Sequence, residues 1–422
     1  MKTLQTYIYQ IKKITTNKTF ITKHKTKPTY FTRNTAKLTF DKLITYQLSL
    51  PKQSAQISLN KIIKQNKWKF TMNKQSLFDA REKLNHTAFI DLNNNHFLKD
   101  YAYNTKNNNT KTFHNHRVIA VDGSIFDVPY GAKEFGTLKT PGEPSPKARA
   151  IAFVDVLNEY ILRAQLQPCN IGEANITKQM LNEYWQTNQN NNSNISDLFL
   201  FDRGFFSRAL TQSICDHNAY FLFRVHSHSL REVQVANKPD QVVVRREKGK
   251  PDLVLRVINY VLPTGEVEKL VTNIFDVSFS VEVFGELYGL RWGVETCFRS
   301  LKSRLQIENF SSAKKELVLQ DFFASVFVYN LMVASIAEAT LRAAVKQRKY
   351  VYRVNKNVAI GEVRDLLIGS FCEDDLVRRG VLFDCAMDVL RRNVVPVRPG
   401  RSYVRLVKYG STKFHINNKS GL

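Results

Sequence analysis

Apolar residues follow a helical spacing in the first part of the chain and a strand-like spacing further on. Between residues 43 and 84 they recur on one face of a helical pattern among lysines, as in small helical DNA-binding domains. The segments with this pattern are Leu43–Leu50, Ile57–Lys64 and Gln75–Leu84. Beyond residue 117 the pattern changes to short apolar runs separated by turns. The sequence therefore predicts a helical N-terminal part followed by an α/β body.

Two of the apolar runs end on an acidic residue. The run that starts at Arg117 ends on Asp122 and Gly123, and the run that starts at Asp197 ends on Asp202. We interpret both runs as buried strands that place a carboxylate at their C-terminal ends. A simpler interpretation remains for each acid. Asp122 suits a turn before a glycine, and Asp202 suits an ion pair with its neighbour, an arginine.

The segment between these two strands predicts a hairpin and a helix. Ala148–Leu157 and Tyr160–Gln167 are apolar runs joined by Asn158 and Glu159, which is a turn signal. Ile176–Tyr184 has helical spacing. The order strand, strand, strand, helix, strand is typical of an α/β domain.

The pattern becomes β-rich again between residues 220 and 284, in what looks like an insertion. The predicted strands are Gln241–Arg246, Leu253–Leu262 and Val267–Phe275. Helical spacing resumes near Val283, continues past Gln306, and returns in a long helix over Leu317–Lys346. The tail is mixed and basic, and Arg398–Lys413 is expected to be extended.

The most apolar run of the chain is Phe322–Ala337. It is shorter than the ~20 apolar residues that a helix needs to cross a bilayer. We therefore expect a buried core helix and no membrane partner. The five cysteines are odd in number and include no C-x-x-C pair, which favours a reducing compartment. No secretory signal is recognised, so a cytoplasmic, nucleoid-associated protein of bacterial type is expected.

The charge of the chain is concentrated at its N-terminus. The formal net charge is +25, and residues 1–74 contain sixteen lysines and arginines against a single acid, Asp41. Such a segment is typical of a part that binds a polyanion, such as a nucleic acid. Hydrophobic residues make up 43% of the chain, which excludes global disorder.

These observations predict five regions, two of which form one interrupted core. Asparagine-rich stretches at Asn104–Thr110 and Asn188–Ser193 are interpreted as surface loops or linkers. We expect a basic, mostly helical DNA-binding domain at 1–115 and a catalytic core at 116–215 and 285–346. A β-rich insertion occupies 216–284, and a C-terminal region for dimerisation or DNA contact occupies 347–422.

The densest chemical signal is the spacing of Tyr288, Arg291, Glu295 and Lys302. On one helix at ~100° per residue, these side chains share a stripe about 60° wide. A solvated, salt-bridged helix face explains such spacing equally well. However, an acid among cations and an aromatic residue, between apolar flanks, also suits a site that grips phosphates.

Two acids at strand ends and one on a later helix have a chemical reason to meet. Asp122, Asp202 and Glu295 would repel one another without a counter-charge. Hard divalent cations such as Mg²⁺ prefer carboxylate oxygens, and two such ions can assist an in-line displacement at phosphorus. No phosphate-binding loop or nucleophile elbow points to nucleotide or ester hydrolysis instead.

The spacing Y-(2)-R-(3)-E-(6)-K, formed by Tyr288, Arg291, Glu295 and Lys302, resembles the signature of the insertion-sequence-four (IS-four) family of bacterial DDE transposases. Further blocks are similar to that family. Two of them, Val121–Ser124 and Phe201–Phe205, resemble the blocks around the family's first and second catalytic Asp. The weaker matches fall where relatives have comparable short motifs: Phe135–Gly136 with Pro146–Arg149, and Leu270–Asn273. The resemblance covers about residues 35–340.

The resemblance implies a ribonuclease-H-like core with a β-rich insertion between the second and third acids. It implies that Asp122, Asp202 and Glu295 bind two Mg²⁺ ions, for which Mn²⁺ can substitute. The DNA-contacting residues that it implies are Tyr288, Arg291, Trp292, Arg299 and Lys302. Trp292 matches a position where some relatives have an indole that contacts a flipped base, although a buried core tryptophan explains it equally well.

The function implied by the resemblance is cut-and-paste transposition of an insertion sequence. The protein would cleave double-stranded DNA at terminal inverted repeats, transfer the freed strand to target DNA, and work as a homodimer in a synaptic complex. Two alternatives remain at this point: an inactive, transposase-derived DNA-binding protein, and a nuclease with a ribonuclease-H-like fold.

Overall fold

The computed structural model describes residues 3–33, 36–103, 110–137, 145–188, 195–226, 229–342, 351–373 and 375–397. They belong to two compact units. The sheet unit is Thr105–Phe298, and the helical unit combines Met1–Asn104 with Arg299–Leu422. The five predicted regions stay a prediction, and the structure assigns the C-terminal helices to the same unit as the N-terminal ones.

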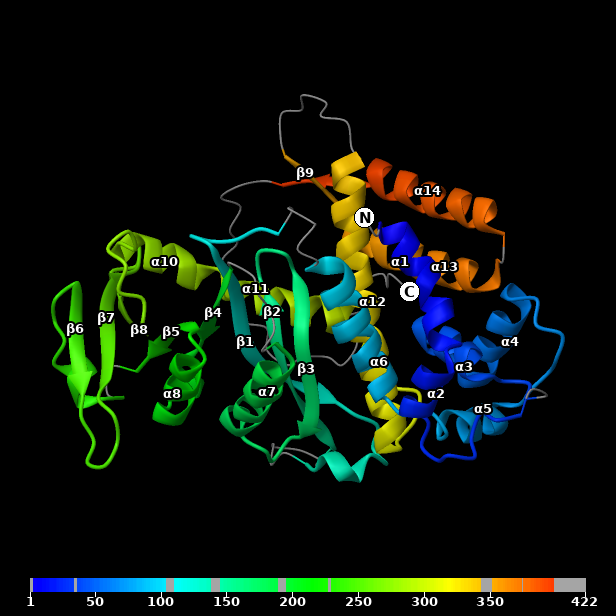
Figure 1. Cartoon of the computed structure of the whole chain (residues 1–422), viewed down its shortest axis with the longest axis horizontal. Helices are drawn as coiled ribbons and strands as arrows, with labels where there is room; N and C mark the ends of the chain where they lie inside the picture. Colours follow the sequence, from blue (N-terminus) through cyan, green and yellow to red (C-terminus); the bar gives the residue numbers. More distant parts are fainter. Residues whose placement is uncertain are drawn as a thin grey trace. The chain divides into compact units, whose positions relative to one another are not determined.

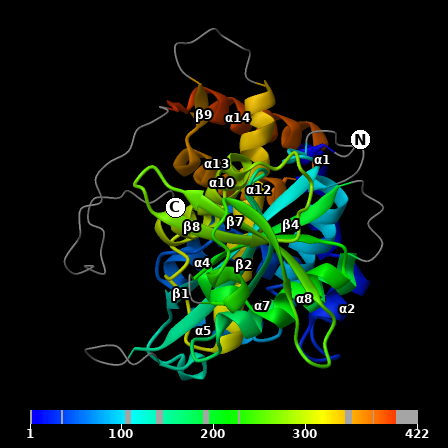
Figure 2. The ribbon, with the colours of Figure 1, turned by 90° about the vertical axis from the view of Figure 1, so that its left-hand side faces the viewer.

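An eight-stranded sheet forms the centre of the sheet unit (Figure 1). Its strands are β1 (His116–Asp127), β2 (Lys147–Asp155), β3 (Tyr160–Pro168), β4 (Ser196–Phe201), β5 (Tyr220–Val225), β6 (Asp240–Arg245), β7 (Leu253–Val261) and β8 (Val267–Thr272). Their order across the sheet is β3-β2-β1-β4-β5-β8-β7-β6, and Figure 2 views the sheet from its β6 end. β1, β4 and β5 are parallel, and the other neighbouring pairs are antiparallel.

β1 is longer than the predicted strand. Its parallel pairing with β4 ends at Val121, which lies opposite Phe201, whereas its pairing with β2 continues to Asp127. Asp122 is therefore not at a strand end, as the sequence analysis expected. It lies where β4 ends and Asp202 begins the next segment, so the two acids are still brought to the same edge of the β1/β4 pair.

The predicted hairpin and the β-rich segment are both present. β2 and β3 pair antiparallel around a turn in which Glu159 has a φ of 61°, in the left-handed region. The β-rich segment is not a separate sheet, because β8 pairs with β5 and carries β7 and β6 with it. The β-rich segment therefore extends the central sheet.

Helices cover this sheet at several places. α7 (Glu173–Asn188) packs on β2 and β3, α8 (Arg208–Asp216) on β5, and α10 (Val281–Gly289) on β7. The shorter helices of the unit are η2 (Lys133–Phe135), η3 (Arg203–Phe205) and α9 (Arg231–Gln234), and α11 (Trp292–Arg299) runs to the end of the unit. The core between the layers is rich in aromatic rings, such as Phe201 stacked on Phe223 at 4.4 Å between centroids.

The continuous helix expected from Val283 past Gln306 is interrupted. α10 ends at Gly289, and the amide groups of Arg291 and Val294 bond to carbonyls three residues back instead of four. Glycine has a low helix propensity, and Gly293 also touches Val156, where an added Cβ would lie 2.9 Å from a methyl group. The chain therefore tightens between α10 and α11, directly at the predicted signature.

The helical unit is built from both ends of the chain. Its first part contains α1 (Leu4–Thr15), α2 (Lys18–His24), α3 (Phe40–Leu48), α4 (Ala55–Gln65), α5 (Lys74–Arg81), α6 (Thr87–Asp91) and the π-helix η1 (Leu92–Ala102). Its second part contains the π-helix η4 (Ser300–Arg304), α12 (Lys315–Arg342), β9 (Tyr352–Val354), α13 (Lys356–Cys372), α14 (Leu376–Arg392) and β10 (Val394–Pro396). The three helices predicted between residues 43 and 84 correspond to α3, α4 and α5.

α12 is the central element of this unit. It packs against α3, α6, α13 and α14 (Figure 1). By length and composition it is the one helix among the described residues that is apolar enough to cross a membrane, but 94% of its most apolar window is buried inside the structure. The prediction of a buried core helix is therefore confirmed.

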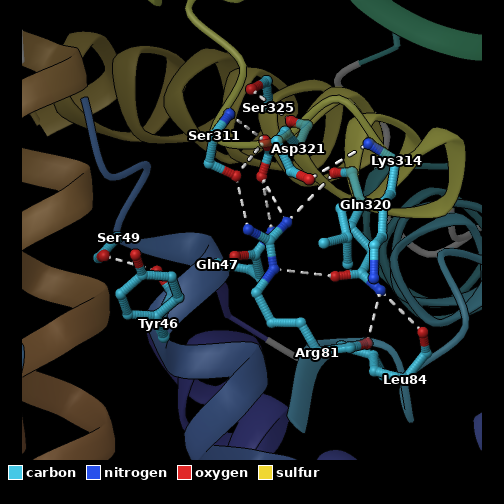
Figure 3. Close-up of polar contacts among 12 residues, drawn as sticks. Tyr46, Gln47, Ser49, Arg81, Leu84, Ser311, Lys314, Gln320, Asp321 and Ser325 are labelled. Carbon is cyan, nitrogen blue, oxygen red and sulfur yellow. Dashed lines mark hydrogen bonds and ion pairs between the residues drawn. The ribbon is translucent and has the colours of Figure 1, made fainter. Parts of the chain in front are cut away.

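A buried polar network joins α5 to α12 (Figure 3). The side chain of Arg81 is fully buried, and its guanidinium donates to the Asp321 carboxylate at 2.8 Å and to Gln320 at 3.2 Å. Burial by itself raises the pKa of Asp321, but the charge of Arg81 and hydrogen bonds from Ser311 and Gln47 lower it overall. Asp321 is thus held as a carboxylate inside the core.

Several predictions fall on residues that the structure does not describe. They are the extended tail at Arg398–Lys413 and most of the two asparagine-rich stretches, at 104–109 and 189–194. The four cysteines whose side chains are described, Cys169, Cys215, Cys297 and Cys385, are all unbonded.

Candidate active site

The sheet unit gathers three carboxylates around one guanidinium. Arg291 lies at the tight turn between α10 and α11, and its side chain is only 4% exposed. Its Nη1 contacts the Asp122 carboxylate at 3.3 Å, and its Nη2 contacts the Glu295 carboxylate at 3.0 Å. The positive charge of the same guanidinium also helps to lower the pKa of Asp202. Arg291 thus contacts two of the three acids, and its charge also acts on the third, Asp202.

Burial dominates the electrostatics of Asp122. Desolvation raises the pKa of this carboxyl to about 6, although the Gly123 amide donates a hydrogen bond to it at 2.8 Å and Arg291 lies beside it. The negative charges of Glu295 and Glu173 act in the same direction as burial. Burial, with the two neighbouring acids, therefore outweighs the charge of Arg291 at this carboxyl.

Asp202 has the opposite balance. Burial raises its pKa, but the Arg203 amide, which donates at 2.7 Å, and the positive charges of Arg224 and Arg291 lower it overall. Arg224 on β5 is the ion-pair partner, at 3.0 Å. The predicted alternative, an ion pair with Arg203, is therefore replaced by a backbone hydrogen bond from Arg203 and a salt bridge to a residue further along the chain.

The aromatic residues of the signature lie beside Arg291. Tyr288 on α10 is buried, which raises the pKa of its phenol, and its hydroxyl donates to the Asp202 carboxylate at 3.4 Å. Trp292 is 53% exposed, and its ring centroid lies 5.2 Å from the Arg291 guanidinium carbon. The interpretation of Trp292 as a core residue is therefore wrong, and the indole is available to a ligand.

The last two predicted DNA contacts belong to the helical unit. Arg299, the last residue of α11, is exposed. Lys302 lies on η4, and its ammonium contacts the Glu308 carboxylate at 3.4 Å. The single straight helix assumed for the signature is interrupted between α10, which ends at Gly289, and α11, which begins at Trp292.

The sequence analysis missed several charged residues around the acids. Arg224 contacts both Asp202 and Glu268 on β8, the latter at 2.7 Å. Leu270 lies opposite Arg224 across the β5/β8 pair, so Glu268, two residues away, shares its face of the sheet. A lone arginine in the otherwise apolar run Tyr220–Val225 was the available signal. The inserted strand β8 therefore helps to fix Asp202.

A fourth acid lies beside the first. Glu173, the first residue of α7, pairs with Arg149 on β2 at 3.2 Å. A Cβ added at Gly123 would lie 2.5 Å from the Glu173 Oε1 and 3.0 Å from the Ile151 side chain. The carboxylate of Glu173 therefore occupies the space where a side chain after Asp122 would begin, and any larger residue there would displace it.

Gly123→Ala is expected to destabilise the protein by about 1 kcal/mol, because the added methyl group displaces the end of Glu173 from its partly exposed contact with Arg149. Urea unfolding measures this change. Gly204→Ala, which alters the glycine two residues after Asp202 in open space, is the control and should stay within about 0.5 kcal/mol. Adding Glu173→Ala to Gly123→Ala should restore part of the loss; no recovery would mean that Glu173 is not the obstacle.

The donor set fits a divalent cation, but the site is not closed around one. Carboxylate oxygens are the ligands that Mg²⁺ and Mn²⁺ prefer in proteins. Among the residues that the structure describes, no group of three or more His, Cys, Asp and Glu side chains is arranged to hold a metal ion as it stands. The reason is local: Arg291 lies between the carboxylates of Asp122 and Glu295.

Comparison with known proteins gives three findings. The family model of the transposase DDE domain matches residues 113–331. Transposase InsG of the insertion sequence element IS4 from Escherichia coli is 25% identical over 240 residues, which are 51% of this chain and 51% of that protein. The chain thus spans about half the length of this curated relative.

The third finding is a solved structure, a piggyBac transposase synaptic complex with hairpin DNA. The match has a TM-score of 0.46 and 11% sequence identity, and covers 94% of this chain and 87% of that one. The family match is the decisive finding, since it spans more than half of the chain and includes Asp122, Asp202 and Glu295. The chain belongs to the family of transposase DDE domains and is similar to the IS4 transposase, as the resemblance implied.

Proposed function

We propose that this protein cleaves DNA at the ends of an insertion sequence and joins the freed strand to target DNA. The observation that carries the proposal is the grouping of Asp122, Asp202 and Glu295 around Arg291, inside the segment matched by the transposase DDE domain. These acids come from β1, the end of β4 and α11. Such an arrangement suits a reaction at a phosphodiester, whose charge needs metal ions and cations.

The sheet supports a ribonuclease-H-like core. The first five strands lie in the order β3-β2-β1-β4-β5, with an antiparallel hairpin at one side and parallel strands at the other. In open sheets of this kind, ligand-binding residues follow the carboxyl ends of parallel strands. Asp202 follows the end of β4, Asp122 lies on β1 just past its last pair with β4, and Glu295 is on the helix α11.

The residues of the site have distinct roles in this proposal. Asp122, Asp202 and Glu295 would hold two Mg²⁺ ions, with Mn²⁺ as a substitute, and the bound ions would activate the attacking oxygen and stabilise the leaving one. Arg224 keeps Asp202 ionised and oriented, since it lowers the pKa of that carboxyl and contacts it at 3.0 Å. Tyr288 and Arg291 would bind phosphate oxygens, and the exposed Trp292 would stack on a base.

The helical unit would supply most of the affinity for DNA. Its lysine–aromatic segment, residues 61–74, contains a stacked pair, Trp68 and Phe70, with centroids 5.7 Å apart. The ammonium of Lys42 lies 5.6 and 5.2 Å from these two rings. The lysines of the segment are all exposed: Lys61, Lys64, Lys67, Lys69 and Lys74. Exposed lysines beside a rigid aromatic pair suit a nucleic-acid backbone. Arg299 and Lys302 would add further DNA contacts.

Replacing Lys67 and Lys69 by glutamine is expected to weaken DNA binding regardless of sequence and to reduce the slope of log K against log salt by about 0.9 per lost phosphate contact. Fluorescence anisotropy at several salt concentrations measures both. Lys133→Gln with Lys178→Gln removes the same charge from exposed positions of the sheet unit. An equal loss of affinity in that control would show a general charge effect instead of a binding segment.

A cleavage assay tests the proposed function. Duplex DNA that carries the ends of the encoding element is incubated with the protein and Mg²⁺ or Mn²⁺, with and without a target plasmid. We expect metal-dependent cleavage at the ends and joined products with the plasmid. Binding without any cleavage would favour an inactive, transposase-derived DNA-binding protein, and cleavage without joined products would favour a ribonuclease-H-like nuclease.

The active form would be a homodimer that holds two DNA ends in a synaptic complex. Mass photometry of the protein with end-containing DNA measures this. Two protein chains with two DNA ends are expected, and cleavage by a complex of one chain with one end would contradict the proposal.

A further inference from the structure

Arg291 contacts carboxylates in the structure, whereas the proposed function gives it a DNA phosphate as its partner. In the structure its two terminal nitrogens contact carboxylates, Asp122 at 3.3 Å and Glu295 at 3.0 Å. In the proposed reaction the same guanidinium binds a phosphate, and the same carboxylates bind metal ions. A guanidinium and a divalent cation both need the negative charge of these two carboxylates, so they compete for them.

The charge of Arg291 offsets the repulsion between two of the acids. Asp122, Asp202 and Glu295 carry like charges, and the structure sets two cations against them, Arg291 and Arg224. Arg224 is shared between Asp202 and Glu268. Asp122 and Glu295 therefore depend on Arg291 as the cation that contacts them both.

The guanidinium is not fully satisfied in this place. Its Nε is buried and has no hydrogen-bond partner in the structure. An arginine that binds a phosphate uses two donors in a fork, and Nε is commonly one of them. The unpaired donor thus favours a second position in which Arg291 has different partners.

Two aromatic rings also lie beside the Arg291 guanidinium. It lies over the rings of Tyr288 at 5.8 Å and Trp292 at 5.2 Å from their centroids. These contacts do not use the edge of the guanidinium that faces the carboxylates. Trp292 is half-exposed, so the guanidinium has an aromatic neighbour that itself reaches the solvent.

We propose that Arg291 is the counter-ion of the metal-free site and exchanges partners when a divalent cation binds. It neutralises Asp122 and Glu295 until the cation takes these carboxylates, and it then becomes free for a DNA phosphate. This inference rests on the proposed function of the site. It makes metal binding and DNA binding favour each other, because each ligand stabilises the same position of Arg291.

Mn²⁺ binding without DNA tests the exchange. Isothermal titration calorimetry should show that Arg291→Gln binds Mn²⁺ more tightly than the wild type, on the order of tenfold, because the competing cation is gone. Arg291→Lys, which keeps the charge but cannot bridge two carboxylates, should lie between them. Arg203→Gln is the matched control, since Arg203 is exposed next to Asp202, and should change the affinity less than twofold.

A second measurement tests the coupling to DNA. Wild-type affinity for a short duplex should rise several-fold when Mn²⁺ is present, and Arg291→Gln should lose this gain. Equal or weaker Mn²⁺ binding by Arg291→Gln would overturn the exchange, even if the protein cleaves DNA. If Glu295→Gln left Mn²⁺ binding unchanged, the ion would bind elsewhere, and the proposed metal site would fail together with the exchange.

Discussion

Glu295→Gln is expected to lower the rate of DNA cleavage by at least ~100-fold while the protein stays folded and still binds DNA. The substitution keeps the shape of the side chain and an oxygen that can accept the hydrogen bond from Arg291, now at 3.0 Å from the carboxylate. It removes the negative charge that a divalent cation needs. Single-turnover cleavage of end-containing DNA, with the unfolding temperature measured in parallel, separates chemistry from stability.

The matched control for this prediction is Glu286→Gln. Glu286 is exposed on α10, close in sequence to the signature. Its replacement removes the same charge and should leave the cleavage rate within about twofold. If Glu295→Gln cleaved DNA as fast as the wild type, Glu295 would not be a metal ligand, and the assignment of the three acids would be wrong.

The acids could be predicted from the sequence because their signals are local. Asp202 directly follows a short apolar run, and the structure has a buried strand that ends at Phe201. Glu295 belongs to the spaced signature that starts at Tyr288. This signature can be recognised in the sequence, although Tyr288 and Glu295 lie on two helices, α10 and α11, instead of one. The family resemblance then supplied what periodicity could not, namely which acids belong together.

The features that the sequence did not reveal depend on contacts between remote segments. The end of the strand at Asp122 was misplaced, because pairing with the hairpin strand β2 carries β1 on to Asp127 after β4 has ended. The link from Glu268 through Arg224 to Asp202 requires β8 to pair with β5. No spacing rule connects residues that meet only across a sheet.

Some helices of the helical unit could be predicted from the spacing of apolar residues, and others could not. α3, α4 and α5 were predicted because their apolar residues lie on one face, with the rest of the surface basic. α13 lacks a pronounced apolar face, whereas α1 has its buried apolar residues at helical spacing, a signal that the sequence analysis overlooked: Leu4, Tyr7, Ile8 and Ile11. Their stability comes from packing within the helical unit, where α13 contacts α1, α3, α12 and α14.

The second large effect is expected at Arg81. Arg81→Met should destabilise the protein by about 3–5 kcal/mol, because it leaves Asp321 charged and buried without its cation. The guanidinium also donates to the Leu317 carbonyl at 3.1 Å and to Gln320, and these acceptors lose their donor as well. Urea unfolding followed by circular dichroism measures the loss.

Arg342→Met is the control for Arg81→Met, because it also removes an arginine that pairs with acids, but at an exposed position. Arg342 is in the same unit and contacts Glu338 and Asp384, but its side chain is 40% exposed. Water screens such a pair, so a loss below ~1 kcal/mol is expected. A similar small loss for Arg81→Met would mean that water reaches the network in Figure 3.

Combining Arg81→Met with Asp321→Asn shows why the effect at Arg81 is large. If the cost arises from an uncompensated carboxylate, removing that charge should recover part of it, and the double variant should be more stable than Arg81→Met alone. If the cost arises from lost packing between α5 and α12, Asp321→Asn should add a further loss instead. The sign of this coupling therefore decides whether charge compensation or volume holds the N-terminal helices to α12.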